Sequence, residues 1–275
     1  MAVRLSSAAM SSPSLNDVLE RLGIAHVMVI NLDRRSDRWD YVSGHLRARG
    51  LQRFTRVPAV DGRALPAGSL DLLSPRAREL IRRRRRWYHE EMHELGSVGA
   101  ALSHLGLWQR LASAADERWL ILEDDIRIED DLEDVVGRAL AELPERFDAL
   151  CLGHHSDFPG GASSAEIEMR SPMVASSMRF YGLHAYVLAA SGAAILAARA
   201  LPLWIHLDQW ISHLCHSREL DGYFVIPSVV SQLEHVFGSD IISVATATGQ
   251  DVAVEFLPWG QFPDQTELPP ADDES

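Results

Sequence analysis

Residues 118–126 read RWLILEDDI, an apolar run of strand-forming side chains followed at once by three carboxylates. A short continuous apolar run predicts a strand that is buried on both faces of a sheet. Side chains alternate along an extended backbone, so we expect Glu123 and Asp125 to point one way and Asp124 the other. Two carboxylates on one face suit Mg²⁺ or Mn²⁺. A solvated acidic loop is the alternative, because residues 123–134 hold eight acids and one arginine.

The same pattern of buried strands and amphipathic helices extends in both directions from this stretch. Further strands are expected at 26–32, 54–60, 149–152, 185–188 and 223–226. Helices are expected at 16–22, 34–49, 74–95, 98–108, 132–143 and 191–200, and a polar loop at 156–177. Alternating strands and helices predict an α/β fold with a mainly parallel central sheet and helices on both faces. Ligands of such sheets bind beyond the carboxyl ends of the strands.

Composition narrows the classes of protein. The chain has 275 residues, 47% of them hydrophobic and 24% charged, which excludes a disordered chain, a collagen-like fibre and a coiled coil. All 26 basic residues are arginine, and the net charge is -13, which argues against a general nucleic-acid binder. Residues 1–86 nevertheless hold 17 arginines against 8 acids, so this basic part can meet phosphate.

Location is predicted from three features. Two cysteines, Cys151 and Cys215, are too few for a disulfide framework. The start of the chain lacks the apolar core of a secretory signal. The best membrane candidate, residues 184–205, contains an arginine and a proline and much alanine, whereas a spanning helix needs about 20 strongly apolar residues. We therefore expect a cytoplasmic protein with at most peripheral contact with a membrane.

Seven blocks resemble glycosyltransferase family 25, which includes bacterial lipooligosaccharide galactosyltransferases and collagen galactosyltransferases. In chain order they are HVMVINLDRRSDRW (26–39), AVDG (59–62), GSVGAALSHLGLWQRL (96–111), WLILEDDI (119–126), HAYVLAASGAAIL (184–196), LDQW (207–210) and GSDI (238–241). The blocks stand in the order and at the spacing found in the family, and the resemblance covers roughly residues 25–241. The sequence departs from the family at Ala100, where a cysteine is common, and residues 63–95 match no block.

The resemblance implies a GT-A-like, nucleotide-diphospho-sugar transferase fold and a single domain over 25–245. The donor half would be about 25–130 and the acceptor half about 131–245. Residues 1–24 are expected to be a flexible start with a short helix, and residues 246–275 an extension with an acidic disordered tail. The implied reaction transfers a sugar, often galactose, from a UDP-sugar to a hydroxyl group of a glycan or lipid-linked glycan. It inverts the configuration at the transferred carbon and is assisted by Mn²⁺ or Mg²⁺.

The resemblance also assigns residues. Asp125 would ligate the metal, and Asp208 would be the general base, with donor-sugar binding or a helix N-cap as its alternatives. The donor-binding residues implied are Asn31, Leu32, Arg34, Arg38, Ser103, His104, Glu123 and Asp124. A surface ion pair with Asp37 or Asp40 is the alternative role for Arg38, and a structural role the alternative for His104.

Two further motifs have competing interpretations. HEEMH at 89–93 matches the HExxH motif of zinc peptidases, which needs both histidines on one face of a helix. Five arginines at 82–86 can bind phosphate on an acceptor, but on a helix they would point all round it, as in a solvated charged helix. Outside enzymes, the alternative is a sugar-nucleotide- or glycan-binding module without turnover.

Overall fold

The computed structural model describes residues 15–155, 167–241 and 256–267. Its helices are α1 (Leu15–Arg21), α2 (Ser36–Ala48), η1 (Gly62–Ala64), η2 (Ser69–Leu72), α3 (Pro75–Arg83), α4 (Leu95–Ala112), α5 (Leu132–Ala139), α6 (Ala190–Arg199), α7 (Leu207–His216) and α8 (Glu234–Phe237). Its strands are β1 (Ile24–Asn31), β2 (Thr55–Pro58), β3 (Arg118–Leu122), β4 (Ile126–Ile128), β5 (Ala149–His155), β6 (Glu168–Met169), β7 (Val174–Ser177), β8 (Tyr181–Ala189), β9 (Gly222–Val225) and β10 (Val230–Gln232).

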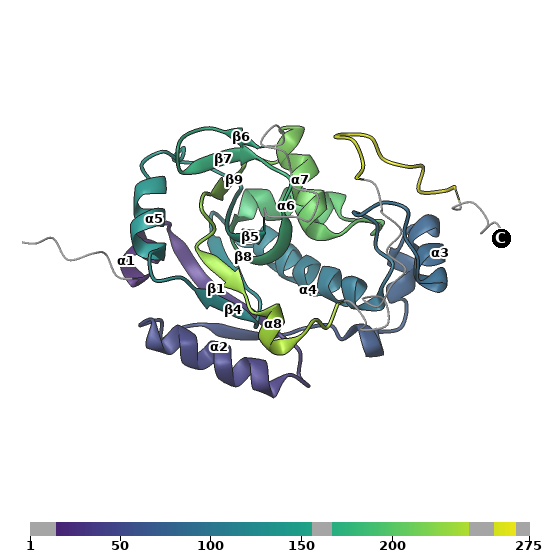
Figure 1. Cartoon of the computed structure of the whole chain (residues 1–275), viewed down its shortest axis with the longest axis horizontal. Helices are drawn as coiled ribbons and strands as arrows, with labels where there is room; N and C mark the ends of the chain where they lie inside the picture. Colours follow the sequence, from purple (N-terminus) through teal and green to yellow (C-terminus); the bar gives the residue numbers. More distant parts are fainter. Residues whose placement is uncertain (1–14, 156–166, 242–255, 268–275) are drawn as a thin grey trace, which may run out of the picture.

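The expected α/β fold is confirmed, with a central sheet in the order β2-β1-β3-β8-β5-β9-β7-β6. The sheet is mixed rather than mainly parallel. β1 is parallel to both β2 and β3, whereas β8 runs antiparallel to both β3 and β5. The small ribbon of β4 and β10 lies beside it (Figure 1). This arrangement agrees with a GT-A-like fold.

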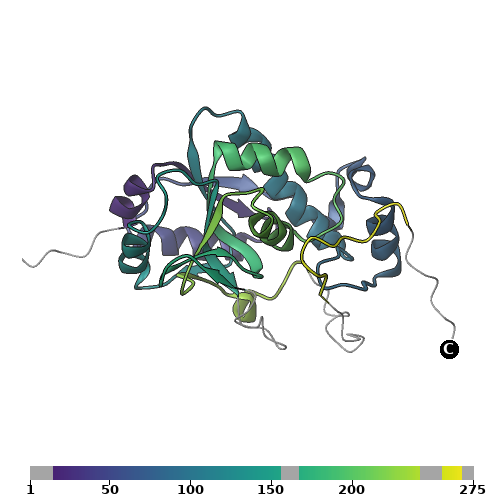
Figure 2. The same cartoon turned by 90° about the horizontal axis from the view of Figure 1, so that it is seen from above.

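Helices cover both faces of the sheet, as Figures 1 and 2 show. β1 explains how: Met28 and Ile30 belong to the core formed with α4, α6 and α7, while Val27 and Val29 belong to the core formed with α1, α2 and α5. Because alternate side chains of a strand point to opposite faces, a strand covered on both sides must be apolar throughout. The continuous apolar runs of the sequence are thereby accounted for.

Three chain segments that carry polar residues meet at one edge of the sheet. β1 and β3 are parallel neighbours, so their carboxyl ends, at Asn31 and Glu123, lie at the same edge. β8 is antiparallel to β3, so its beginning lies there too, and the backbone N–H of Glu123 donates to the carbonyl of His184. The sheet order therefore places residues that are far apart in sequence at one site.

The helix expected over 74–95 is wrong in its second half. Ser74 caps the start, because its hydroxyl accepts a hydrogen bond from the backbone N–H of Ala77. The helix ends at Arg83, and Arg84 has a left-handed backbone with φ of 53°. The chain then runs without helix to α4 and is buried over residues 90–94, where the N–H of Met92 donates to the carbonyl of Trp204. Tertiary contacts override the helical propensity of this charged stretch.

Smaller expectations also need correction or fall outside the described residues. The loop expected at 156–177 contains β6 and the buried strand β7, and β10 follows the strand at 222–225 that was expected to be last. The short helix near residue 16 is confirmed as α1. The flexible start up to residue 14 and the tail from 268 lie outside the described residues. Both cysteines are buried and unbridged.

The end of the described chain packs on the domain. Within residues 256–267, Leu257 is buried, Trp259 stacks on His216, and the carbonyl of Gln265 accepts from the N–H of Arg76. Residues 256–267 therefore join α3 to α7. No helix in the described part of the chain combines the length and apolar character that crossing a bilayer requires.

A close approach of the 59–62 turn to α4 yields a stability prediction. A Cβ on Gly99 would lie 2.5 Å from the carbonyl oxygen of Val60, whereas a Cβ on Gly106 of the same helix meets nothing within 4 Å. Gly99→Ala should therefore lower the free energy of unfolding by about 1–3 kcal/mol through overpacking. Gly106→Ala should raise it by about 0.5–1 kcal/mol through helix propensity. Urea unfolding of both variants checks this, and equal effects would contradict it.

Candidate active site

The sheet edge opens into a cavity of about 590 Å³, within the range of about 300–1,000 Å³ that is usual for small-molecule pockets. It is lined by nine of the ten residues singled out in the sequence, namely Leu32, Arg34, Arg38, Ser103, His104, Glu123, Asp124, Asp125 and Asp208. The tenth, Asn31, is 1% exposed and lies behind the cavity wall. The structure thus brings nearly all of the predicted site residues together.

The acidic triplet follows β3 in a bend rather than in an extended strand, so the predicted alternation of its side chains holds only in part: Asp125 shares Gln232 with Glu123 but shares Arg38 with Asp124. Asp124 accepts a hydrogen bond of 2.7 Å from the Nδ2 of Asn31. Glu123 and Asp125 face the Nε2 of Gln232, at 3.3 and 3.4 Å. Asn31 is therefore a positioning residue for Asp124, rather than a residue that reaches the cavity.

Arg38 provides the positive charge of this cluster. Its Nη1 lies 3.0 Å from Asp124 and 3.1 Å from Asp125, and its side chain is 7% exposed. The expectation of a surface ion pair with Asp37 or Asp40 is therefore wrong. The helix α2 turns Arg38 towards the sheet edge, because Arg38 lies on the buried face that also carries Val42.

The three carboxylates carry more negative charge than Arg38 neutralises. Burial, with the negative charge of Glu123, raises the pKa of Asp125 to about 7. Burial also raises the pKa of Asp124 above its ordinary value. In the described residues, no three His, Cys, Asp or Glu side chains are arranged as a ready-made metal site. A divalent cation here would take its other ligands from the substrate and water.

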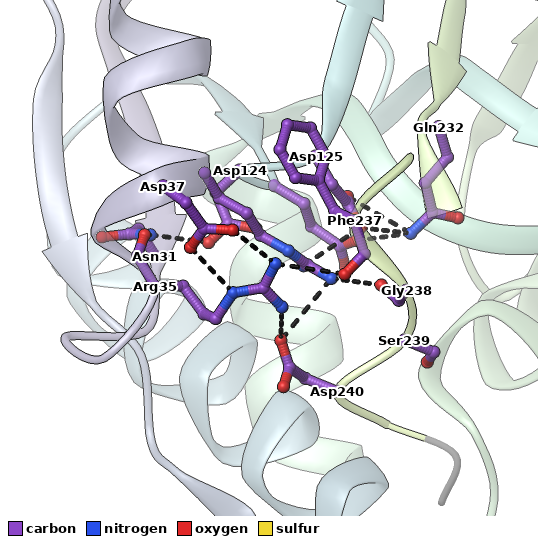
Figure 3. A network of polar contacts seen from close by, with 12 residues as sticks. Asn31, Arg35, Asp37, Asp124, Asp125, Gln232, Phe237, Gly238, Ser239 and Asp240 are labelled. Atoms are coloured by element: carbon purple, nitrogen blue, oxygen red, sulfur yellow. Dashed lines mark hydrogen bonds and ion pairs between the residues drawn. The ribbon is translucent and has the colours of Figure 1, made fainter. Parts of the chain in front are cut away.

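Asp240 joins a second group of arginines to the cluster (Figure 3). Its carboxylate lies 2.7 Å from Arg34 and 3.5 Å from Arg38, and it also pairs with Arg35. Burial alone would raise the pKa of Asp240, but the hydrogen bonds from Arg34 and Arg35 lower it. Arg35, Asp240 and Gln232 were missed as site residues. GSDI at 238–241, which contains Asp240, was the available signal for one of them.

Ser103 and His104 of α4 link the helix to the sheet edge. The Ser103 hydroxyl accepts from the N–H of Val60 at 2.8 Å. His104 contacts the Tyr186 hydroxyl at 2.9 Å and the Glu123 carboxylate at 3.4 Å. His104 thus lines the cavity and also contacts Glu123, so its structural role is confirmed and its role in donor binding stays a prediction.

Asp208 enters the cavity from the first turn of α7. Its carboxylate accepts hydrogen bonds from the backbone N–H groups of Gly182, at 2.8 Å, and Gln209, at 2.7 Å. Burial raises its pKa to about 6, and the negative charge of Glu123 acts in the same direction. A carboxylate held in one orientation with a pKa near neutrality is suited to accept a proton. His206, not Asp208, occupies the N-cap position of α7.

The HExxH interpretation is wrong, because residues 89–93 are not helical. Glu90, the would-be base, is fully buried in an ion pair with Arg179 and accepts from the N–H of Leu257. Its glutamate neighbour Glu91 pairs with Arg76 at 2.7 Å. These glutamates hold the connection between α3 and α4 in place.

The two histidines at the end of β5, His154 and His155, lie in different environments. His154 is buried and contacts the carbonyl of Val225 at 2.9 Å. His155 lines the cavity and is the member of the pair able to approach a ligand.

Comparison with known proteins identifies the family. The model of glycosyltransferase family 25 (LPS biosynthesis protein) matches residues 24–211, from β1 into α7, and thus includes both the acidic triplet and Asp208. A glycosyltransferase 25 family member of Aedes aegypti is 34% identical over 110 residues, 40% of this chain and 18% of that protein. Procollagen galactosyltransferase 2 of Homo sapiens is 32% identical over 110 residues, 40% of this chain and 17% of that protein.

A longer match is to a relative that is named inactive. The mouse protein named inactive glycosyltransferase 25 family member 3 is 27% identical over 235 residues, 80% of this chain and 36% of that protein. The chain therefore spans well under half the length of these three relatives. Because the family match covers most of the chain, including the acidic triplet and Asp208, the chain belongs to glycosyltransferase family 25.

Proposed function

We propose that this chain transfers a sugar from a UDP-sugar donor to a hydroxyl group of a glycan, with inversion at the transferred carbon. One observation carries the proposal: a single cavity in a family 25 chain is lined by the acidic triplet with its arginines and, from helix α7, by the oriented carboxylate of Asp208. A glycosyl transfer needs both a site for a diphosphate leaving group and a base for the acceptor hydroxyl.

The donor diphosphate would bind at the arginine-rich wall. Arg34 and Arg38 line the cavity there, and guanidinium groups bind phosphate oxygens in bidentate fashion. Glu123 or Asp124 would contact the ribose or the water shell of the metal, beside Ser103 and His104. Galactose is the sugar proposed, and a relative named procollagen galactosyltransferase supports it.

A divalent cation, Mn²⁺ or Mg²⁺, fits the residues present. Burial, together with the negative charge of Glu123, raises the pKa of Asp125, and Arg38 offsets this only in part. Such cations are commonly held by one or two carboxylates plus substrate phosphates and water. Asp125 would hold the cation, which would neutralise the departing diphosphate.

Asp208 would take the proton of the acceptor hydroxyl. Its two backbone hydrogen bonds fix the carboxylate, and its pKa of about 6 leaves it mostly ionised at pH 7. The hydroxyl oxygen then forms the new bond to the sugar carbon, and the bond to the diphosphate breaks with its electron pair. A lipooligosaccharide or another lipid-linked glycan is the acceptor proposed, at the cytoplasmic face of a membrane.

Thermal unfolding with UDP, with and without Mn²⁺, tests the donor site. UDP at a hundred times its dissociation constant should add about 2.7 kcal/mol of stability. At one fixed concentration of UDP, the shift in unfolding temperature should be larger with Mn²⁺ than without it. Asp125→Ala should remove the Mn²⁺-dependent part. Asp130→Ala, which removes an exposed carboxylate outside the cavity, should retain it. The absence of a shift with UDP or any other sugar nucleotide would contradict the proposal.

A second candidate is a binding module that keeps the donor site without turnover. It is favoured by the match to a mouse relative named inactive. A UDP-dependent shift with no release of UDP from UDP-sugars, across a panel of hydroxyl acceptors, would support the module over the enzyme.

A further inference from the structure

The five arginines at 82–86 have different partners in the folded chain. Arg82 and Arg83 pair with Glu79, and the guanidinium of Arg84 lies 3.8 Å from Glu94. The guanidinium of Arg85 lies over the ring of Trp87, 4.9 Å from its centre. Of the run, Arg86 alone lines the cavity that the described residues form. The run is therefore neither one phosphate-binding face nor merely a solvated helix.

The positive charge of Arg86 has no carboxylate partner among the described residues. The acids that follow it in sequence are taken by other arginines: Glu90 by Arg179, and Glu91 by Arg76. Arg86 is half-buried, and its Nη1 makes a hydrogen bond of 3.0 Å to the carbonyl oxygen of His89. This leaves the other donors of its guanidinium for a ligand in the cavity.

A chain of contacts places Arg86 on the Asp208 side of the cavity. Arg86 binds the backbone of His89, whose ring lies 6.4 Å from that of Tyr181. The next residue, Gly182, donates its N–H to Asp208. Arg34 and Arg38, beside the acidic triplet, are by contrast held by Asp240, which follows α8. Two separate positive groups thus serve the two sides of one cavity.

We propose that Arg86 binds an anionic substituent, a phosphate or carboxylate group, on the acceptor sugar. This inference rests on the proposed function, in which Asp208 faces the acceptor hydroxyl. A guanidinium offers a planar fork of donors that matches phosphate and carboxylate oxygens, and such charge-assisted hydrogen bonds are about twice as strong as neutral ones. An arginine on the Asp208 side of the cavity, without a carboxylate partner among the described residues, would therefore select a charged acceptor over a neutral one.

The test uses three sugars of one scaffold: methyl glucoside, methyl glucoside 6-phosphate and methyl glucuronide. Their binding to the whole chain is measured by calorimetry, with and without UDP. The anionic sugars should bind at least about tenfold more tightly than the neutral one, as expected for one charge-assisted pair. The ranking of phosphate against carboxylate identifies which anion the site prefers.

Variants attribute the preference to Arg86. Arg86→Gln should remove it, and Arg86→Lys should retain part of it, because the charge remains without the planar fork. Arg82→Gln, at a side chain that is 69% exposed and outside the cavity, should retain it fully. Thermal unfolding of each unligated variant shows that the fold is kept.

Two results overturn the inference. One is equal binding of neutral and anionic sugars by the unaltered chain. The other is a loss of UDP affinity in Arg86→Gln with the sugar preference intact, which would assign Arg86 to the donor. A failure of UDP to bind the unaltered chain counts against the proposed function instead, and the sugar series measured without UDP still decides the role of Arg86.

Discussion

Asp208→Asn is expected to lower the rate of sugar transfer by about 10²–10⁴-fold, the usual contribution of a general base. The amide keeps the shape of the carboxylate and an oxygen that accepts from Gly182, but it cannot take a proton. The loss should appear in kcat rather than in the KM for UDP-sugar. Steady-state kinetics, with an acceptor on which the unaltered chain shows transfer, measures both constants.

Asp208 lies in the first turn of a helix, so a matched control must remove a carboxylate from the first turn of another helix. Asp134 lies in the first turn of α5, exposed and outside the cavity. Asp134→Asn should leave kcat unchanged. An unchanged kcat in Asp208→Asn, or a rise in the KM for UDP-sugar with kcat intact, would assign Asp208 to donor binding instead.

The pH profile gives a second readout at the same residue. Because the pKa of Asp208 is about 6, kcat/KM of the unaltered chain should rise with pH through about 6. Stability should change in the opposite direction. The folded chain binds this proton more tightly than the unfolded chain, whose aspartate titrates near 3.8, so this stabilisation is present below that pH and is lost as the pH rises through about 6. Asp208→Asn should remove the part of each dependence that is centred near pH 6, while Asp125, whose pKa is about 7, still contributes to the stability profile.

Arg179→Met is expected to lower the free energy of unfolding by about 3–5 kcal/mol, because it leaves the buried charge of Glu90 without its partner. The two side chains are 4% and 0% exposed, and the guanidinium also donates to the carbonyl of Leu257 at 2.9 Å. Its face packs on Trp259, 4.5 Å from the ring centre. Removing Arg179 therefore also loosens residues 256–267. Urea unfolding measures the change.

An exposed pair of the same chemistry is the control. Arg218 pairs with Glu168, and both side chains are more than half exposed. Arg218→Met should therefore change stability by less than about 1 kcal/mol. A similarly small effect for Arg179→Met would mean that water reaches Glu90. Adding Glu90→Gln to Arg179→Met should recover part of the loss, because the buried charge is then gone.

The long buried strands and the acidic triplet could be predicted from sequence because their signals are local, whereas the short strands β4, β6, β7 and β10 were missed. The bounds expected for the strand at 118–122 agree with those of β3, since a continuous apolar run can be satisfied only by burial on both faces. The alternation expected within the triplet was only partly right, because residues 124 and 125 lie in a bend, where Asp125 reaches both Gln232, beside Glu123, and Arg38, beside Asp124. The family blocks then brought Asp208 into the same prediction.

Partners far apart in the chain could not be predicted in this way. Glu90 and Arg179 are separated by 89 residues, and Asp240 and Arg34 by 206. The connection at 84–94 has the composition of an exposed charged helix, yet Glu90 and Glu91 are both fully buried. Which arginine neutralises which carboxylate depends on packing that no local pattern records.

The sequence by itself therefore determined the α/β class, the position of β3 and the acidic triplet at its end, since each follows from short-range backbone geometry and burial. Tertiary structure alone decided that Arg38 neutralises Asp124 and Asp125, that Asp240 gathers the arginines at the end of β1, and that Arg86 faces the cavity. The reason is physical: burial requires each charge to have a partner, and only the folded chain brings the partners within reach.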